Sequence, residues 1–425
     1  MALAPHLPAD TGSATEPAPS YTEGACAPDR APARCGPGRL VFRPPVGEGP
    51  WSFAAPGDLP RVSADEARAW FDPGSLVALR PDRAALGSLV DAWCAEDGAR
   101  GHASAVTWLR TLPDVLAISL VRREREGGRR YAFHIPGYRG PVVVSERRFR
   151  ELGRRPRHLL PAIPRRVRPA FSAPPGHCYI VIDINRCFLV LLATVANDDA
   201  LLAAAAGDFH QQAGDAMAPH LTPTQRRRVG KLFNNAVVGM ITPHGLQEAL
   251  RRAGIATTPQ QAAQLHDRWW ASFVAARRLR DAWIAGQKHL AEEGRPLAIR
   301  YPDGRTYTFD AATVRGAAPR PRWAHLRSPS QRLDAATRTT FSALWRGVEG
   351  TIIDQWLRLL HPLRRQGLRL VLPMYDGLLL QAPTPVASHL AQSAHAALRR
   401  ALTDVGVPAT ATCTIQAAWA PPIRS

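Results

Sequence analysis

Two short apolar segments that each end at an aspartate constrain the fold of this chain more than any other feature. Residues 178–183 read CYIVID, a continuous apolar run that is typical of a strand buried on both faces. Residues 368–382, LRLVLPMYDGLLLQA, predict a hairpin that turns at Asp376-Gly377. Because helical patterns separate these two segments, the sequence predicts an α+β domain whose sheet joins distant parts of the chain.

Carboxylates at the ends of neighbouring strands can hold divalent metal ions. Phosphoryl transfer by a two-metal mechanism needs such carboxylates on rigid supports, which the strand ends of one sheet supply. Asp183 and Asp376 fit this pattern. On the residues alone a second interpretation stays open, because aspartate is common in turns and Asp-Gly is a frequent hairpin turn.

The net charge indicates the class of partner. Lys and Arg number 54 against 35 Asp and Glu, and the resulting charge of +19 favours a polyanion, nucleic acid first. Basic proteins also visit anionic membranes, but no apolar run approaches the ~18 residues that a membrane span needs. The N-terminal sequence lacks the regions of a signal peptide, and the six cysteines form no CxxC pair. We therefore expect a soluble, cytoplasmic protein without a membrane partner.

Composition divides the chain into four parts. Residues 1–45 predict a flexible Pro/Ala-rich tail, and residues 46–145 predict a small mixed α/β domain of unknown role. Residues 146–168 form a basic linker, which is either a solvated connector or a strap on phosphates. Its arginines include Arg165, Arg166 and Arg168. Residues 169–425 contain both aspartate motifs.

Periodicity predicts the elements of this last part and of the small domain before it. Helical patterns cover about 186–206, 208–218, 222–239, 243–253, 258–290, 334–361 and 385–404. Further strands are expected over 297–309, as a pair, and over 408–418. In the small domain, SADEARAWF and RAALGSLVDAWCAE predict helices, whereas DVLAISLVRR, YAFHIPG and PVVVSE predict strands.

A basic helix supplies the third chemical feature. Thr222-Pro223 is typical of a helix start, and Arg227 and Lys231 follow four residues apart on one face. Such a face can neutralise the triphosphate of a nucleotide, although a solvated charged face is the ordinary alternative. Lys231 is one of only two lysines in an arginine-rich chain, which favours a requirement for a compact charge at this position.

The order and spacing of six segments resemble a known family. These segments are RPAFSAPPGHCYIVID, NDDALLAAAAGDFHQQAGDAM, TPTQRRRVGKLFNNAVVGMITPHGL, EGTIID, LPMYDGLLLQAP and AAWAPP. Together, residues 166–420 resemble the polymerase domain of family A DNA polymerases, the bacterial DNA polymerase I group. The resemblance implies a polymerase palm, an antiparallel sheet with helices, and a helical fingers insertion over about 207–295.

The resemblance also implies roles for individual residues. Asp183 and Asp376 become the catalytic residues and the ligands of two Mg²⁺ ions, for which Mn²⁺ is a possible substitute. The residues expected at the incoming dNTP are His210, Arg227, Lys231, Asn235 and Phe188. The residues expected at the primer-template DNA are Arg305, Glu349, Tyr375 and the three linker arginines named above.

Several positions depart from the family pattern. Asn235 stands where an aromatic residue usually stacks on the incoming base, and Gly239-Met240 stands where Tyr-Gly is usual. Phe188 replaces a glutamate that screens the sugar; its ring is either a steric gate that favours dNTP or ordinary helix core. Gly377 replaces an auxiliary carboxylate. Neither thumb helices nor the acidic motifs of a proofreading exonuclease are recognisable.

The sequence therefore predicts a template-directed DNA polymerase that lacks proofreading and acts with primer-template DNA and dNTPs, associated with the nucleoid. Two alternatives stay open. Asn235 and Gly239 suit a primase-like or template-relaxed nucleotidyltransferase that accepts rNTPs. The second alternative is a non-catalytic remnant of a polymerase that binds nucleic acid. The presence of both aspartates and of Lys231 argues against it.

Overall fold

The computed structural model describes only part of the chain. The described residues are 38–45, 49–60, 70, 81–97, 119–125, 128–134, 142–145, 167–317, 328–374 and 376–419. Their strands form three sheets, with the orders β11-β6-β10-β9, β1-β2-β7-β8 and β3-β4-β5. Mixed helices and strands are thus confirmed as the fold class at a coarse level.

The sheet that carries both aspartate motifs is antiparallel throughout. Its strands are β11 (Ala411–Gln416), β6 (His177–Ile184), β10 (Gly377–Pro383) and β9 (Arg369–Met374). In β6, Ile180 and Ile182 belong to the main core, whereas Tyr179 and Val181 belong to a second core on the opposite face. Successive side chains of a strand point to opposite faces, so burial on both faces explains the unbroken apolar run.

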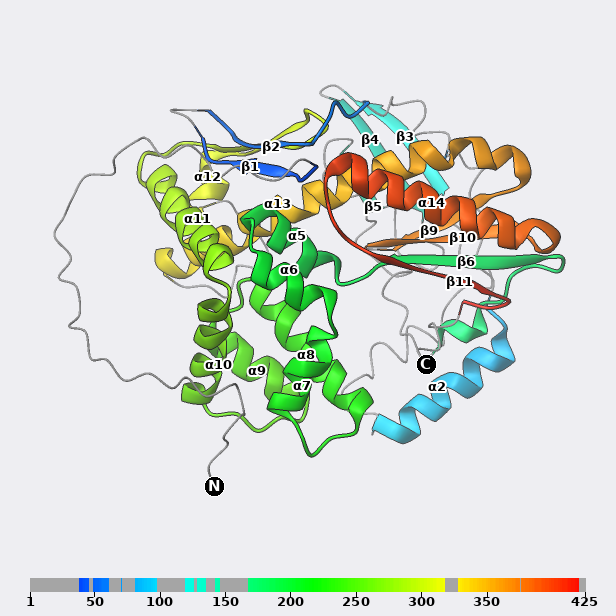
Figure 1. Cartoon of the computed structure of the whole chain (residues 1–425), viewed down its shortest axis with the longest axis horizontal. Coiled ribbons are helices and arrows are strands. Elements are labelled where there is room, and N and C mark those ends of the chain that lie inside the picture. Colours follow the sequence, from blue (N-terminus) through cyan, green and yellow to red (C-terminus); the bar gives the residue numbers. More distant parts are fainter. Residues whose placement is uncertain are drawn as a thin grey trace.

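Helices cover both faces of this sheet. α13 (Pro329–Leu360) and α14 (Ala387–Val405) pack over one face and contribute leucines to the main core (Figure 1). On the other face, Leu86 and Val90 of α2 (Arg83–Asp97) join Phe171 and Trp419 in the second core. The predicted helix over RAALGSLVDAWCAE is therefore present and packs against the sheet.

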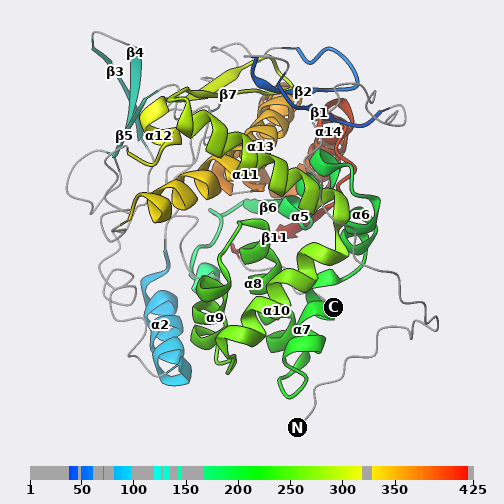
Figure 2. The same cartoon turned by 90° about the vertical axis from the view of Figure 1, so that its left-hand side faces the viewer.

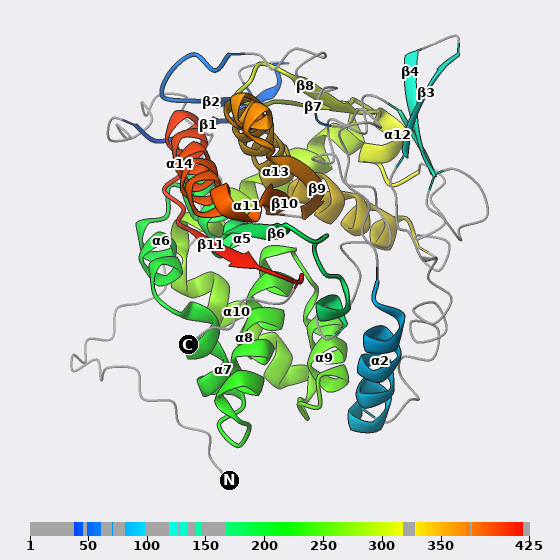
Figure 3. The same cartoon turned by 90° about the vertical axis from the view of Figure 1, so that its right-hand side faces the viewer.

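A cluster of helices follows β6 in the chain. Its members are α5 (Cys187–Ala196), α6 (Asp199–Ala206), α7 (Phe209–Met217), α8 (Pro223–Val238), α9 (Pro243–Arg252), α10 (Pro259–Ser272) and α11 (Val274–Glu292). In Figures 2 and 3, α7 to α10 lie below the central sheet, and the sheet of β1, β2, β7 and β8 lies at the opposite end. Most of these helices begin at a Thr or Asp cap, as Thr222 does for α8.

Two long helical patterns are each broken into two helices. The pattern over 186–206 breaks at Asn197, which adopts a left-handed conformation with φ of 53°. The pattern over 258–290 breaks at Phe273. Asp198 lies at both breaks, because its carboxylate accepts from the N–H of Leu201 at 2.9 Å and from the N–H of Ala276 at 2.9 Å. One buried carboxylate therefore caps α6 and the first turn of α11.

The second sheet brings the N-terminal segment onto the rest of the chain. β1 (Val41–Arg43) and β2 (Trp51–Ala54) form a hairpin, and β2 pairs in parallel with β7 (Leu297–Arg300), which pairs with β8 (Thr306–Phe309). The expectation of a tail up to residue 45 is wrong at 41–43, because these residues pair with β2. The remaining division into domains stays a prediction.

The third sheet is an antiparallel meander of β3 (Ser119–Arg125), β4 (Gly128–His134) and β5 (Val142–Ser145). These strands overlap the three segments that the sequence predicted as strands. The helix predicted over SADEARAWF lies outside the described residues except for Trp70, whose indole N–H donates to the Leu357 carbonyl at 2.8 Å. No helix in the described ranges has the length and apolarity needed to cross a membrane.

Candidate functional site

Asp183 and Asp376 come together at one end of the central sheet. Asp183 pairs with Gly377 in the register of β6 and β10, so Asp376 lies one residue beyond the paired position. The N–H of Ile184 donates to the carbonyl of Asp376 at 2.9 Å, which ties the two backbones together at this point. The strand-end juxtaposition of the two motifs is therefore a feature of the structure.

Gly377 allows the two strands to approach closely beside Asp183. A Cβ at Gly377 would lie 2.3 Å from the carbonyl oxygen of Ile182 and 3.1 Å from Oδ1 of Asp183. The first contact is shorter than van der Waals packing permits and involves backbone, so a side chain at this position would displace the strand backbone. The glycine that follows Asp376 is thus required by the arrangement of the strands.

Arg186 links the end of β6 to the start of α7. It lies three residues after Asp183 and adopts a left-handed conformation with φ of 51°. Its guanidinium donates to the carbonyls of Ala206, at 3.2 Å, and Gly207. The helix that carries His210 is therefore held close to the strand that carries Asp183.

A second contact, made by Asp208, joins α7 to α8. Asp208 caps α7 by accepting from the N–H of Gln211 at 3.2 Å, and it also accepts from Nε of Arg227 at 2.9 Å. Burial alone would raise the pKa of Asp208, but the hydrogen bonds from Arg227 and Gln211 outweigh it and lower the pKa. Arg227 is thus fixed near the turn that Arg186 holds.

His210 is buried where α7 and α8 meet, with 3 % of its surface exposed. The helices approach so closely that a Cβ at Gly230 would lie 1.8 Å from the carbonyl oxygen of His210. Asn234 Nδ2 lies 3.1 Å from Nδ1 of His210. Desolvation, together with the positive charges of Lys231 and Arg227, lowers the pKa of His210 to about 4. The imidazole is therefore neutral at neutral pH.

Lys231 and Asn235 follow Arg227 at helical spacing on α8. Lys231 is exposed and Asn235 is half-buried, whereas the opposite side of the helix buries Val229, Phe233 and Val237 in the core. The basic face that the sequence predicted is therefore present. His210, Arg227 and Lys231 interact electrostatically, because both cations influence the titration of the histidine.

Other predicted site residues have structural partners. Phe188 lies in the first turn of α5 and is half-buried against the main core. Glu349 is buried in α13. Arg168 places its guanidinium 4.5 Å from the ring centre of Trp419, a cation–π contact on the second core. Burial or a ring contact thus describes these three positions, and their roles toward nucleotide or DNA stay predictions.

Arg305, expected at the primer-template DNA, is engaged inside the protein. It forms an ion pair with Asp303 and another with Asp354 of α13, at 3.1 Å. Asp354 is the last residue of the EGTIID motif. Two carboxylates neutralise this guanidinium, so the geometry gives no support to a contact with phosphate. Tyr375, Arg165 and Arg166 lie outside the described residues.

The donor set near the strand ends suits a hard cation. Within the described ranges no group of three or more His, Cys, Asp or Glu side chains gathers as a metal site. Asp183 and Asp376 supply two carboxylates, and Mg²⁺ is commonly bound by one or two carboxylates with water and substrate phosphates completing its shell. The two residues therefore fit Mg²⁺ better than a metal that needs a full set of protein ligands.

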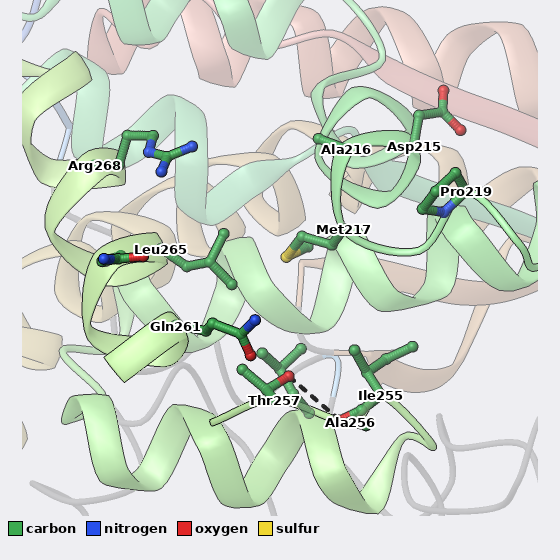
Figure 4. Close-up of a pocket in the computed structure, with 12 residues that line it drawn as sticks. Asp215, Ala216, Met217, Pro219, Ile255, Ala256, Thr257, Gln261, Leu265 and Arg268 are labelled. Carbon is green, nitrogen blue, oxygen red and sulfur yellow. Dashed lines mark hydrogen bonds between the residues drawn. The ribbon is translucent and has the colours of Figure 1, made fainter. Parts of the chain in front are cut away.

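A pocket of about 410 Å³ lies among α7, α9 and α10 (Figure 4). Met217, Leu250 and Leu265 give it an apolar lining, and Asp215 and Arg268 lie on opposite sides of it. None of the sequence-predicted site residues is among its lining residues. The pocket is thus lined by other residues than the site that contains Asp183, His210, Arg227 and Lys231.

Sequence reasoning missed three residues of the site: Arg186, Asp208 and Asn234. Asp208 carries a recognisable signal, since an aspartate directly before a helical pattern is a common cap. Asn234 also carries one, because it is a polar residue on the apolar face of a predicted helix. Arg186 has no such signal, since its contacts depend on a left-handed turn.

Comparisons with known proteins place these features in context. No protein-family model matches the chain. It is similar to the thermostable DNA polymerase I of Thermus thermophilus, with 29 % identity over 246 residues, which are 56 % of this chain and 26 % of the relative. It is also similar to DNA polymerase I of Chloroflexus aurantiacus, with 26 % identity over 264 residues, 60 % of this chain and 25 % of the relative. The resemblance inferred from the motifs is thereby confirmed, and the chain spans about a quarter of the length of the curated relatives it matches.

The fold has a counterpart among solved structures. It resembles the POL domain of Pol1 from M. smegmatis, solved in complex with DNA primer-template and dNTP, with a TM-score of 0.51 and 16 % identity. The match covers 80 % of this chain and 56 % of that one. At this identity the likeness concerns the fold.

Proposed function

We propose that this chain is a template-directed DNA polymerase that adds dNTPs to the 3′-OH of a primer. The observation that carries the proposal is the pairing of β6 with β10, which brings Asp183 and Asp376 together beside the linked helices α7 and α8. In this proposal the central sheet is the palm and the helices from α7 to α11 are the fingers. The similarity to DNA polymerase I proteins supports the reaction class.

Asp183 and Asp376 would hold two Mg²⁺ ions. Bound there, the ions would lower the pKa of the primer hydroxyl and stabilise charge on the leaving pyrophosphate. The residues of the chain orient the nucleotide: Arg227 and Lys231 provide positive charge for the triphosphate, and His210 provides a neutral hydrogen-bonding group. Preorganised groups of this kind stabilise developing charge without reorganisation during the reaction.

The nucleic acid would be bound mainly through its phosphates. The charge of +19 and the many arginines support a salt-dependent interaction that is largely independent of sequence. The proposal also includes that this polymerase acts without proofreading. The proposal includes association with the nucleoid.

The residues expected around the nucleotide support a second candidate function, the use of rNTPs. Asn235 and Gly239 supply less bulk around the nucleotide than the family pattern does, which supports acceptance of rNTPs by a primase-like enzyme. Phe188 opposes it only if its ring reaches the sugar. The same primer-extension assay, run with dNTPs and then with rNTPs, separates the two candidates.

The decisive experiment compares the protein with its Asp183→Asn and Asp376→Asn variants. We expect each variant to abolish primer extension while primer-template binding stays within about twofold, because amides remove metal-binding charge without removing the basic surface. Asp267→Asn, a change at an exposed position of α10, is the matched control and should extend primers normally. Primer extension by either active-site variant at the rate of the unmodified protein would refute the assignment.

A further inference from the structure

Asn234 is a buried amide that joins three helices. Its side chain is fully buried in α8. Its Oδ1 accepts from the indole N–H of Trp269, on α10, at 3.0 Å. Its Nδ2 lies 3.1 Å from Nδ1 of His210 and 3.3 Å from the carbonyl oxygen of Phe209, both on α7.

The chemistry of these groups permits one arrangement of protons. An indole N–H can only donate, so the oxygen of the Asn234 amide must face Trp269 and its NH₂ must face His210. The NH₂ can only donate, so Nδ1 of His210 must accept. A neutral imidazole that accepts at Nδ1 carries its proton on Nε2. Trp269 thus fixes the amide, and the amide fixes the tautomer.

The surrounding charges keep this imidazole neutral. Lys231 and Arg227 on α8 oppose protonation, Asp208 at the start of α7 favours it less strongly than either of them opposes it, and Arg186 before α5 adds a smaller opposing effect. Burial opposes protonation more than any of these charges. Geometry and charge therefore agree on a single form, the neutral ring with Nε2–H.

We propose that Asn234 is a positioning residue that, together with Trp269, holds His210 as its Nε2–H tautomer, a neutral hydrogen-bond donor for the phosphate oxygens of the incoming nucleotide. The tautomer follows from the hydrogen bonds alone, whereas its use toward phosphate rests on the proposed function. In this proposal Arg227 and Lys231 supply positive charge, and His210 supplies a hydrogen bond of fixed direction. A buried donor that stays neutral at physiological pH keeps this role unchanged across that range.

Nitrogen NMR of protein labelled at histidine tests the tautomer without any activity measurement. The His210 signals are identified by their loss in His210→Gln. We expect an unprotonated Nδ1, a protonated Nε2 and no titration between about pH 5.5 and 8. A protonated Nδ1 in the unmodified protein would overturn the proposal by itself.

The Asn234→Asp variant replaces the NH₂ donor beside His210 by an acceptor oxygen at nearly constant side-chain size. A carboxylate accepts from Trp269 but cannot donate to Nδ1, so we expect Nδ1 of His210 to become protonated. Asn197→Asp, which adds the same charge at an exposed helix end, should leave the His210 signals unchanged. A folded Asn234→Asp protein that keeps Nδ1 unprotonated would also overturn the proposal.

Nucleotide kinetics test the role toward phosphate. Asn234→Asp should raise the KM for dNTP about tenfold, and in a His210→Gln background the same change should alter KM by less than about twofold. A tenfold effect that persists without the histidine would mean that the new carboxylate repels the nucleotide directly, which contradicts a role through His210. If the unmodified protein extends no primer, the proposed function fails while the NMR result still decides the tautomer.

Discussion

Substituting Gly377 with alanine tests how tightly the two aspartate strands must pack. The added Cβ would lie 2.3 Å from the Ile182 carbonyl oxygen and 3.0 Å from the Cα of Asp183. Both are backbone atoms of a central strand, so no rotamer change relieves the contact. The strands must separate, and Asp183 must move relative to Asp376.

The magnitude follows from two opposing effects. Overpacking a well-packed interior costs about 1–3 kcal/mol, and replacing glycine by alanine recovers about 0.4–1 kcal/mol by reducing the freedom of the unfolded chain. Because the added Cβ at Gly377 meets backbone atoms of β6, we expect a net loss of about 2 kcal/mol in the free energy of unfolding.

Urea unfolding and primer extension measure the two consequences. Gly87→Ala is the matched control, since a Cβ at this helical position meets nothing within 4 Å. The control should gain about 0.5–1 kcal/mol from helix propensity. Gly377→Ala should lose stability and also extend primers more slowly than its folded fraction explains. A Gly377→Ala protein as stable and active as the parent would refute the close approach of these strands.

Four further predictions concern the helix of the basic face and its neighbours. Met240 follows α8 at φ of 55°, in a turn closed by hydrogen bonds from Met240 to Val237 and from Ile241 to Ala236, so Met240→Gly should raise the free energy of unfolding by about 1 kcal/mol in urea titrations. The pKa of His210 falls from 6.5 to about 4 on folding, so the unfolded state binds its proton first and stability falls as the pH drops from about 6.5 toward 4. Between about pH 7 and 5 this residue should account for a loss of about 2 kcal/mol that is missing in His210→Gln; equal pH profiles would contradict a buried neutral ring. Lys231→Ala should weaken nucleotide use by about 1.5–3 kcal/mol in KM measurements, and full rescue by Lys231→Arg would show that any cation suffices. Phe188→Ala should raise rNTP use about tenfold if the ring gates the sugar; a lower melting temperature with an unchanged sugar ratio would retire the gate.

Local signals predicted much of the fold. The run CYIVID predicted β6, and the Asp-Gly turn predicted the β9–β10 hairpin. Both predictions were possible because burial and turn formation depend on residues that are adjacent in the sequence. Thr222 and Pro223 gave the start of α8, where the capping box with Gln225 is present. The same signature at Ser328, Pro329 and Gln331 begins α13 five residues before the predicted start at 334, so that boundary was readable but missed.

Features that depend on distant partners were not predictable. The break between α10 and α11 depends on Asp198, which lies far earlier in the chain and caps Ala276. The pairing of β2 with β7 joins segments separated by most of the protein, and no local pattern announces it. In the site, the aspartates and the basic face followed from motifs, whereas the neutralisation of Arg305 by Asp303 and Asp354 required the folded arrangement.

The N-terminal hairpin belongs to the smallest fragment of this chain that we expect to fold by itself. The ring centres of Trp51 in β2 and Trp283 in α11 lie 4.9 Å apart in a tilted arrangement, and those of Phe53 and Tyr301 lie 6.1 Å apart. A truncation that removes β1 and β2 would leave β7 as an open edge strand and bare two large aromatic rings, a surface that invites self-association. The stretch that resembles DNA polymerase I is therefore smaller than the unit that folds, and recombinant fragments trimmed to it should aggregate.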